Sequence, residues 1–94
     1  MEYEFTKQFV KDLKHFRHDA KFVHYLGAKI NHAFKATSVD KIDGLELIRG
    51  TSVHYRFKIK TDTFTYRIGI KRLKKVIWFA CIDNNKKRFY KRFP

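Results

Sequence analysis

The 94-residue sequence has few of the residues that bend, break or cross-link a chain. It contains one proline, four glycines and one cysteine. We find no linker, internal repeat or low-complexity segment, so we expect a single domain over residues 1–94. The glycines form no phosphate-binding loop, and no serine or cysteine lies in a nucleophile motif. Cys81 alone cannot form an internal disulfide, which fits a reducing compartment, and we expect it to be a buried small apolar residue.

Acidic residues are scarce in the second half of the sequence. Residues 1–48 contain 8 Lys or Arg and 7 Asp or Glu, a balance of +1. Residues 49–94 contain 14 Lys or Arg and 2 Asp or Glu, a balance of +12. This asymmetry predicts a polyanion or an acidic protein as partner, and it does not by itself separate binding from catalysis.

Long apolar runs are also absent, and none approaches the length that spans a membrane. The opening Met1-Glu2-Tyr3-Glu4-Phe5 has acids where a signal peptide would be basic. We therefore expect no signal peptide, no membrane partner and a cytoplasmic location. His15 and His18 are spaced for a shared metal ion, but no carboxylate or cysteine completes the set. No metal or other cofactor is predicted.

Two neighbouring segments, residues 53–60 and 66–71, alternate apolar and basic residues with the period of a β-strand. Their basic positions are His54, Arg56, Lys58 and Lys60 in the first, and Arg67 and Lys71 in the second. The residues between them are short and polar enough for a hairpin turn. A turn centred on Asp62-Thr63 places Lys58 opposite Arg67. Like charges in that position destabilise a sheet, so either an anionic ligand receives them or they form a solvated basic face.

The remaining segments complete an α+β pattern. Residues 3–5 predict a strand, and two amphipathic helices follow, at 7–17 after the N-cap Thr6 and from Asp19 to about Lys35. Residues 45–48 form an apolar patch that could cover the end of the sheet, and residues 76–82 predict a buried central strand. We expect an N-terminal strand and helical hairpin packed on one face of a small antiparallel sheet (β-α-α-β-β-β), with the basic side chains on the other face.

The last residues, 86–94, interleave basic and aromatic side chains. Aromatic rings beside cations can stack on unpaired bases while the cations hold the phosphate backbone. Alternatively, the rings pack on the sheet. We expect a mixture in which Phe89 and Phe93 are structural and Tyr90 is available to a ligand.

These features together resemble the small toxins of the RelE/ParE superfamily, the toxic halves of bacterial toxin–antitoxin pairs. The similarity lies in Tyr3-Glu4-Phe5-Thr6, Tyr55-Arg56-Phe57-Lys58-Ile59, Tyr66-Arg67-Ile68-Gly69 and the ending Phe89-Tyr90-Lys91-Arg92-Phe93-Pro94. It covers nearly the whole chain and implies a RelE-like fold. RelE-like members are metal-independent mRNA interferases: they enter the ribosomal A site, where the 2′-hydroxyl of the mRNA attacks the adjacent phosphate and translation is inhibited.

The resemblance implies the roles of individual residues. The expected catalytic residues are Arg56, Lys58, Arg67 and Tyr90, and the expected RNA-binding residues are His54, Lys60, Lys71, Lys86, Lys87 and Arg88. Lys58 or Arg56 would help to deprotonate the 2′-hydroxyl, and Arg67 would hold the scissile phosphate. Tyr90 would position the base. Many relatives have His-Arg shortly before the terminal tyrosine, where this chain has Asn85-Lys86, so the cation that protonates the leaving oxygen stays open among Lys86, Lys87 and Arg88.

Two other functions stay open as alternatives. ParE-like members share the fold, lack the nuclease residues and inhibit DNA gyrase, whereas a third reading is a basic module that only binds RNA. The basic strand face favours the interferase branch. The expected partners are the ribosome with its mRNA and a cognate antitoxin that is acidic and partly disordered. Such an antitoxin segment would fold in an apolar groove beside the helices or near residues 45–48.

Overall fold

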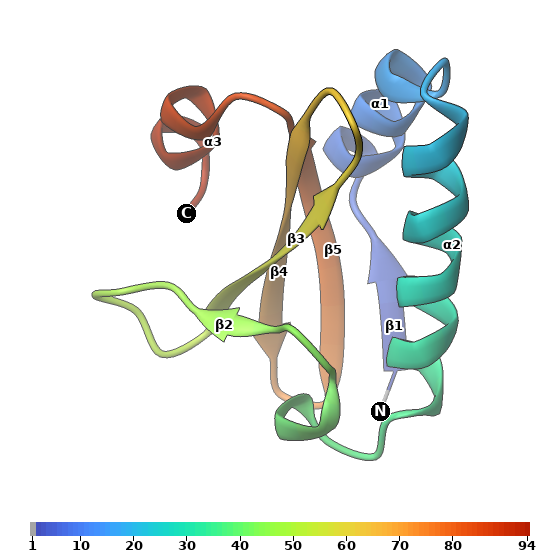
Figure 1. The fold of residues 1–94 in the computed structure, drawn as a ribbon. Coiled ribbons are helices and arrows are strands. Elements are labelled where there is room, and N and C mark those ends of the chain that lie inside the picture. Colours follow the sequence, from blue (N-terminus) through green and yellow to red (C-terminus); the bar gives the residue numbers. More distant parts are fainter. Residues whose placement is uncertain (1) are drawn as a thin grey trace.

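The computed structural model describes residues 2–94 and confirms the expected α+β fold (Figure 1). One five-stranded sheet has the order β1-β5-β4-β3-β2. The strands are β1 (Glu2–Phe5), β2 (Glu46–Leu47), β3 (His54–Lys60), β4 (Thr65–Leu73) and β5 (Val76–Asp83). The helices are α1 (Lys7–Phe16), α2 (Ala20–Lys35), the 3₁₀ turn η1 (Val39–Lys41) and α3 (Lys86–Arg92).

The sheet is mixed, which corrects the expectation of a purely antiparallel one. β1 runs parallel to β5, whereas β5, β4, β3 and β2 pair antiparallel. A parallel neighbour requires a crossover connection, which two helices and the rest of the sheet supply here. The apolar segment at 45–48 also differs from expectation, because Glu46 and Leu47 extend the sheet as the edge strand β2 instead of covering its end.

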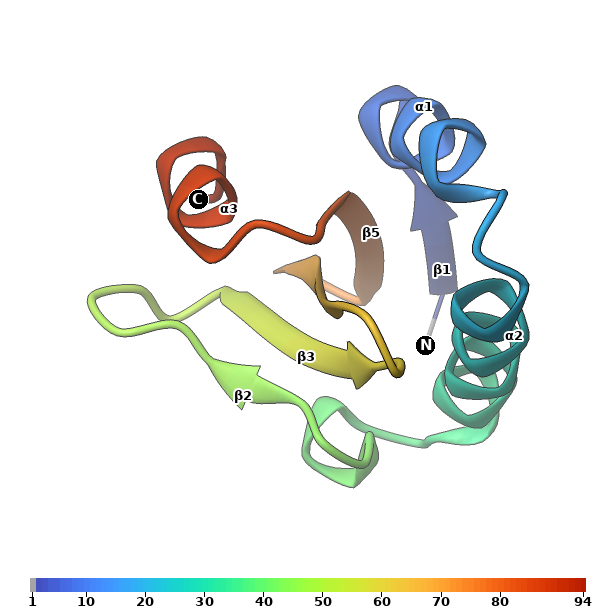
Figure 2. The same cartoon turned by 45° about the horizontal axis from the view of Figure 1, so that its top comes forward.

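The main core lies between the sheet and the first two helices, which cover one face (Figures 1 and 2). Both helices begin where the sequence predicts. Thr6 accepts a hydrogen bond from the Phe9 amide at 3.0 Å, and Asp19 accepts one from the Phe22 amide at 3.0 Å. Phe9 and Phe22 are then almost fully buried. These caps satisfy backbone donors that a helix start would otherwise leave unpaired.

A second, smaller core lies on the opposite face, where α3 packs (Figure 2). Phe89 and Phe93 are buried there against Cys81, whereas Tyr90 is 39% exposed, as expected from the sequence. Burial raises the pKa of the Cys81 thiol to about 11, so this cysteine stays a protonated, apolar core residue. The expectation that this face is left to basic side chains therefore holds only where α3 does not cover it.

Gly69 is the position that lets α3 approach the sheet so closely. A Cβ added there would lie 2.8 Å from Cδ2 of Phe93 and 2.9 Å from Sγ of Cys81. The pairing of β4 with β5 is irregular at the same place, because Gly69 is opposite Cys81 and Ile70 is opposite Phe79, which leaves Ala80 extra. This bulge turns Cys81 toward α3 while Phe79 and Ile82 both face the main core.

Side chains of α1 complete the outer edge of β5. The pairing with β1 ends at Phe79, so the last residues of β5 lack a strand on that side. The Thr6 hydroxyl donates to the Ala80 carbonyl at 2.7 Å, and the Asp12 carboxylate accepts from the Ile82 amide at 2.9 Å. Buried backbone groups need such partners, and here a helix supplies what a strand would.

Candidate nucleic-acid interface

Three elements converge on the face that carries α3. β3 contributes Arg56 and Lys58, β4 contributes Arg67, and α3 contributes Tyr90. The hairpin register confirms the expected pairing, because Lys58 lies directly opposite Arg67. The four residues assigned to catalysis by resemblance thus come from adjacent strands and the helix beside them.

Arg67 is the most buried cation of this cluster, with 8% of its surface exposed. Its Nε has no hydrogen-bond partner among residues 2–94, and no carboxylate of these residues forms an ion pair with it. Its Cζ lies 6.0 Å from the centroid of the Tyr90 ring, within reach of a cation–π contact. Asp83 lies directly opposite Arg67 on β5, but its carboxylate is bound by Arg88 and Arg92 instead. A buried arginine without an ion pair of its own favours an anionic ligand.

Arg56 is fixed beside Arg67 by two partners. Its Nε donates to the Tyr90 hydroxyl at 2.7 Å, and its terminal nitrogens contact the Glu46 carboxylate at 3.3 and 3.4 Å. Burial alone would lower the pKa of Arg56, but the contacts with Tyr90 and Glu46 outweigh it and raise that pKa. Arg56 is therefore a fixed positive charge and a poor proton acceptor.

Lys58 and Lys60 are exposed on β3. They also line a groove of about 480 Å³ between this strand and α2. The other residues along the groove are Tyr25, Ala28, Lys29, His32, Asp43 and Ile59. A ligand in this groove would touch Lys58. It would reach Tyr90 only if it extended across β3.

His54 and Lys71 face each other across β3 and β4 at the other end of the hairpin. His54 Nδ1 lies 2.7 Å from the Thr51 hydroxyl, and its ring meets Phe93 edge-on at 5.2 Å. Burial and, secondarily, the charge of Lys71 lower the pKa of His54 below its usual value. A neutral imidazole at pH 7 leaves Lys71 as the cation of this pair.

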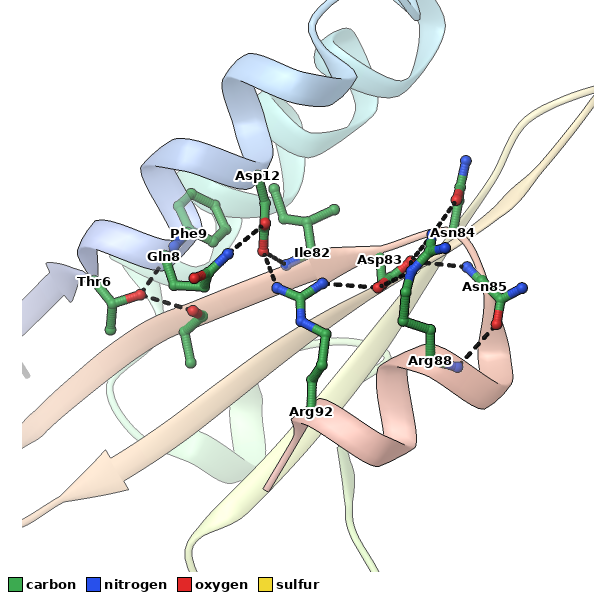
Figure 3. A network of polar contacts seen from close by, with 11 residues as sticks. Thr6, Gln8, Phe9, Asp12, Ile82, Asp83, Asn84, Asn85, Arg88 and Arg92 are labelled. Carbon is green, nitrogen blue, oxygen red and sulfur yellow. Dashed lines mark hydrogen bonds and ion pairs between the residues drawn. The ribbon is translucent and has the colours of Figure 1, made fainter.

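The expected cations of α3 have different environments. Lys86 and Lys87 are exposed in the first turn, which Asn85 caps by accepting from the Arg88 amide at 2.8 Å. Arg88 is instead bound to Asp83, with Nε–Oδ2 at 2.8 Å and Nη2–Oδ1 at 2.6 Å (Figure 3). The guanidinium of Arg88 is thus part of a structural ion pair, whereas the two lysines have their charges in solvent.

Sequence reasoning missed the acids that organise this face. Glu46 holds Arg56, and Asp83 holds Arg88 together with Arg92. Asp83 carried a signal, because it is one of two acids in the basic half and directly follows an apolar run. Glu46 carried none, since it lies in the apolar segment 45–48, where the sequence indicated no partner for an acid.

Residues 2–94 were also compared with the requirements of a metal site and of a membrane-spanning helix. No group of three or more His, Cys, Asp or Glu side chains in this range could hold a metal ion. In the same range, no helix has the length and apolar character needed to cross a membrane.

The architecture and its cationic face can be compared with known proteins. A scan against models of protein families and a search of curated proteins give no match. Among solved structures, the chain is similar to a chain of the RelB–RelE antitoxin–toxin complex from Methanococcus jannaschii. The two are 28% identical, the match covers 96% of this chain and 98% of that chain, and the TM-score is 0.74.

This match shows that the chain has the fold of RelE-like toxins. The resemblance inferred from the short motifs is confirmed, and the chain has the RelE-like toxin fold over nearly its whole length.

Proposed function

We propose that this chain is the toxin of a type II toxin–antitoxin pair and a ribosome-dependent mRNA interferase. The observation that carries the proposal is Arg67, a buried cation that forms no ion pair within residues 2–94, lies opposite Lys58 and has its Cζ 6.0 Å from the centre of the Tyr90 ring. A phosphodiester would supply the missing negative charge. Fixed cations in a desolvated site stabilise charge that develops on phosphate oxygens in the transition state.

The reaction would be an attack of the mRNA 2′-oxygen on the adjacent phosphorus. The new O–P bond gives a 2′,3′-cyclic phosphate, the bond from phosphorus to the 5′-oxygen breaks, and that oxygen takes up a proton. Arg67 would hold the phosphate and Tyr90 would position the base. Of the two residues considered for deprotonation, Lys58 is the better choice, because Arg56 is fixed as a cation by Tyr90 and Glu46.

The geometry of α3 also narrows the choice of the group that protonates the leaving oxygen. Arg88 is bound to Asp83, and an arginine does not release its proton near neutral pH. Lys86 is four residues before Tyr90, so the two lie on the same side of the helix. Lys87 is three residues before Tyr90 and lies on that side too, so Lys86 and Lys87 are our candidates for the general acid.

The experiment compares cleavage of naked mRNA with cleavage of the same mRNA bound to programmed ribosomes. A cluster of cations has no strong base at neutral pH, so we expect poor cleavage of naked RNA. Orientation by the ribosome can supply about 7–11 kcal/mol of the barrier reduction. Equal rates on both substrates would rule out ribosome dependence. No cleavage of either would favour inhibition of gyrase, which a DNA supercoiling assay would then test.

We also propose that an acidic, partly disordered antitoxin silences this chain. The groove between α2 and β3 supports this, because Lys29, Lys58 and Lys60 surround an apolar floor that includes Tyr25 and Ala28. Opposite charge should make association fast and salt-sensitive. Co-expression with the product of the neighbouring reading frame should restore growth and give a complex that co-purifies. A neighbour that neither binds nor rescues would contradict this part of the proposal.

A further inference from the structure

A network of ion pairs built on two buried acids joins α1, β5 and α3 (Figure 3). Asp83 at the end of β5 is 1% exposed, and Asp12 of α1 is 8% exposed. Arg92 contacts both acids, with Nη1 at 2.7 Å from Oδ2 of Asp83 and Nη2 at 2.9 Å from Oδ2 of Asp12. One guanidinium therefore ties the last helix to two elements at once.

Each of the two acids also accepts hydrogen bonds from other groups, so the position of each carboxylate is fixed. Asp83 also receives the guanidinium of Arg88, and Asp12 also accepts from the Ile82 amide and from Gln8 Nε2 at 2.8 Å. Buried carboxylates persist only when paired and hydrogen-bonded with good geometry. The planar fork of arginine can reach two carboxylates in fixed directions, whereas a lysine cannot.

Tyr90 depends on this arrangement because α3 is only seven residues long. A helix of that length is not stable without tertiary contacts. Two pairs of side chains spaced by four residues anchor it: Phe89 and the C-cap residue Phe93 pack on the sheet, and Arg88 and Arg92 bind the acids. The apolar pair holds the helix on the sheet, and the arginine pair fixes its rotation. Tyr90 leaves the helix on a third side.

We propose that Arg92, held by Asp12 and Asp83, is a positioning residue that sets Tyr90 against Arg56 and Arg67. The Tyr90 hydroxyl lies 2.7 Å from Arg56 Nε, and its ring centroid lies 6.0 Å from Arg67 Cζ. A rotation of α3 about its own axis would break the first contact. The effect of Arg92 on activity rests on the proposed function, but its effect on the placement of Tyr90 does not.

The placement of Tyr90 is measured first, without any assay of activity. The chain is labelled with 3-fluorotyrosine, and the ¹⁹F resonance of Tyr90 is assigned as the one lost in Tyr90→Phe. Arg92→Gln should shift this resonance and leave the other four of the five tyrosines in place. Lys91→Gln is the matched control, because it removes the same charge from an exposed neighbour and should shift none.

An unchanged Tyr90 resonance in folded Arg92→Gln would overturn the proposal. If the other four resonances show that this variant is unfolded, Arg92→Lys replaces it. Lysine keeps the charge but cannot span both acids, so the Tyr90 resonance should still move. A native Tyr90 resonance in Arg92→Lys would then overturn the proposal instead.

A double-mutant cycle tests whether Arg92 acts on the reaction through Tyr90. We expect Arg92→Gln to lower kcat on ribosome-bound mRNA by roughly ten- to a hundredfold, as small misplacements do, with little change in KM. In a Tyr90→Phe background the same change should cost less than about threefold. Equal losses in both backgrounds would contradict a positioning role. An inactive wild-type protein would refute the proposed function, and the ¹⁹F result would still decide the inference.

Discussion

Two arginines on the α3 side of the sheet, Arg67 and Arg92, have opposite surroundings. Arg92 is bound to two carboxylates that are themselves buried. Arg67 is buried too, but within residues 2–94 no acid pairs with it and its Nε lacks a partner. The protein thus pairs the first arginine with its own acids, whereas the second forms no ion pair within residues 2–94 and is the one that we propose binds a ligand.

The difference distinguishes Arg92, whose charge holds the fold together, from Arg67, whose charge we propose binds a ligand. Burial alone would lower the pKa of Arg92, but its hydrogen bonds to Asp12 and Asp83 outweigh it and raise that pKa. Two carboxylates offset the desolvation of Arg92, whereas Arg67 has only the Tyr90 ring and the neighbouring Asp83, whose carboxylate is bound by other arginines. Basic residues that look alike in the sequence can therefore be sorted by the acids near them.

Breaking the ion pair between Asp83 and Arg92 should have the largest effect on stability. We expect Asp83→Asn to lower the free energy of unfolding by about 3 kcal/mol, because Arg92 loses a buried partner. Urea unfolding at pH 7 measures this. Asp62→Asn is the control, since Asp62 is the other acid of the basic half and its contact with Lys21 is exposed. Equal losses in the two variants would show that burial of the pair is unimportant.

The same pair sets a pH dependence. Burial alone would raise the pKa of Asp83, but the hydrogen bonds from Arg88 and Arg92 outweigh it and lower that pKa. The unfolded state then binds more protons than the folded state, so this stabilisation is present above about pH 4 and is lost as pH falls further. Urea midpoints from pH 7 down to pH 3 should decline in the wild type. The decline should be shallower in Asp83→Asn.

Removing the unpaired arginine should instead affect activity. We expect Arg67→Ala to reduce cleavage of ribosome-bound mRNA by about 10²–10³-fold, the usual loss when a group that stabilises transition-state charge is removed. Growth inhibition should disappear while the circular dichroism spectrum stays native. Arg72→Ala removes the same charge from an exposed position on β4 and should have little effect. Full toxicity of folded Arg67→Ala would exclude Arg67 from the site.

The smallest predicted effect is the change in stability when a side chain is added at Gly69, where α3 approaches the sheet closely. A Cβ at position 69 would lie 2.8 Å from Phe93, so Gly69→Ala should cost about 1–3 kcal/mol of stability, as overpacking does. Gly27 lies in α2 with nothing within 4 Å of such a Cβ. Gly27→Ala should therefore stabilise the protein by roughly 0.5–1 kcal/mol. Thermal unfolding of both variants gives the comparison, and a stabilising Gly69→Ala would contradict it.

Much of the fold could be predicted because its signals are local. Thr6 and Asp19 mark helix starts by their own side chains, and the two-residue alternation identified β3 and β4. The cross-strand pair Lys58–Arg67 followed from the turn between these strands. The burial of Phe89 and Phe93 and the exposure of Tyr90 were also predicted from the basic, aromatic tail.

The parts that were not predicted depend on contacts distant in the sequence. Nothing near residue 92 indicates that its partner is Asp12, and nothing near Glu46 indicates that it meets Arg56. The parallel pairing of β1 with β5 is of the same kind. Arg88 was assigned to RNA binding from the resemblance and from its place in the basic, aromatic tail, and only the structure places its charge against Asp83.

The Asp12–Arg92 contact also bears on the order in which the molecule is built. It joins residues that are 80 apart in the sequence, and α3 itself is too short to be stable without the sheet on which it packs. We therefore expect the helix-covered core to form before α3 locks into place. A chain still under synthesis would hold a folded scaffold without an assembled cluster around Tyr90, so its capacity to harm would arise only when folding is complete.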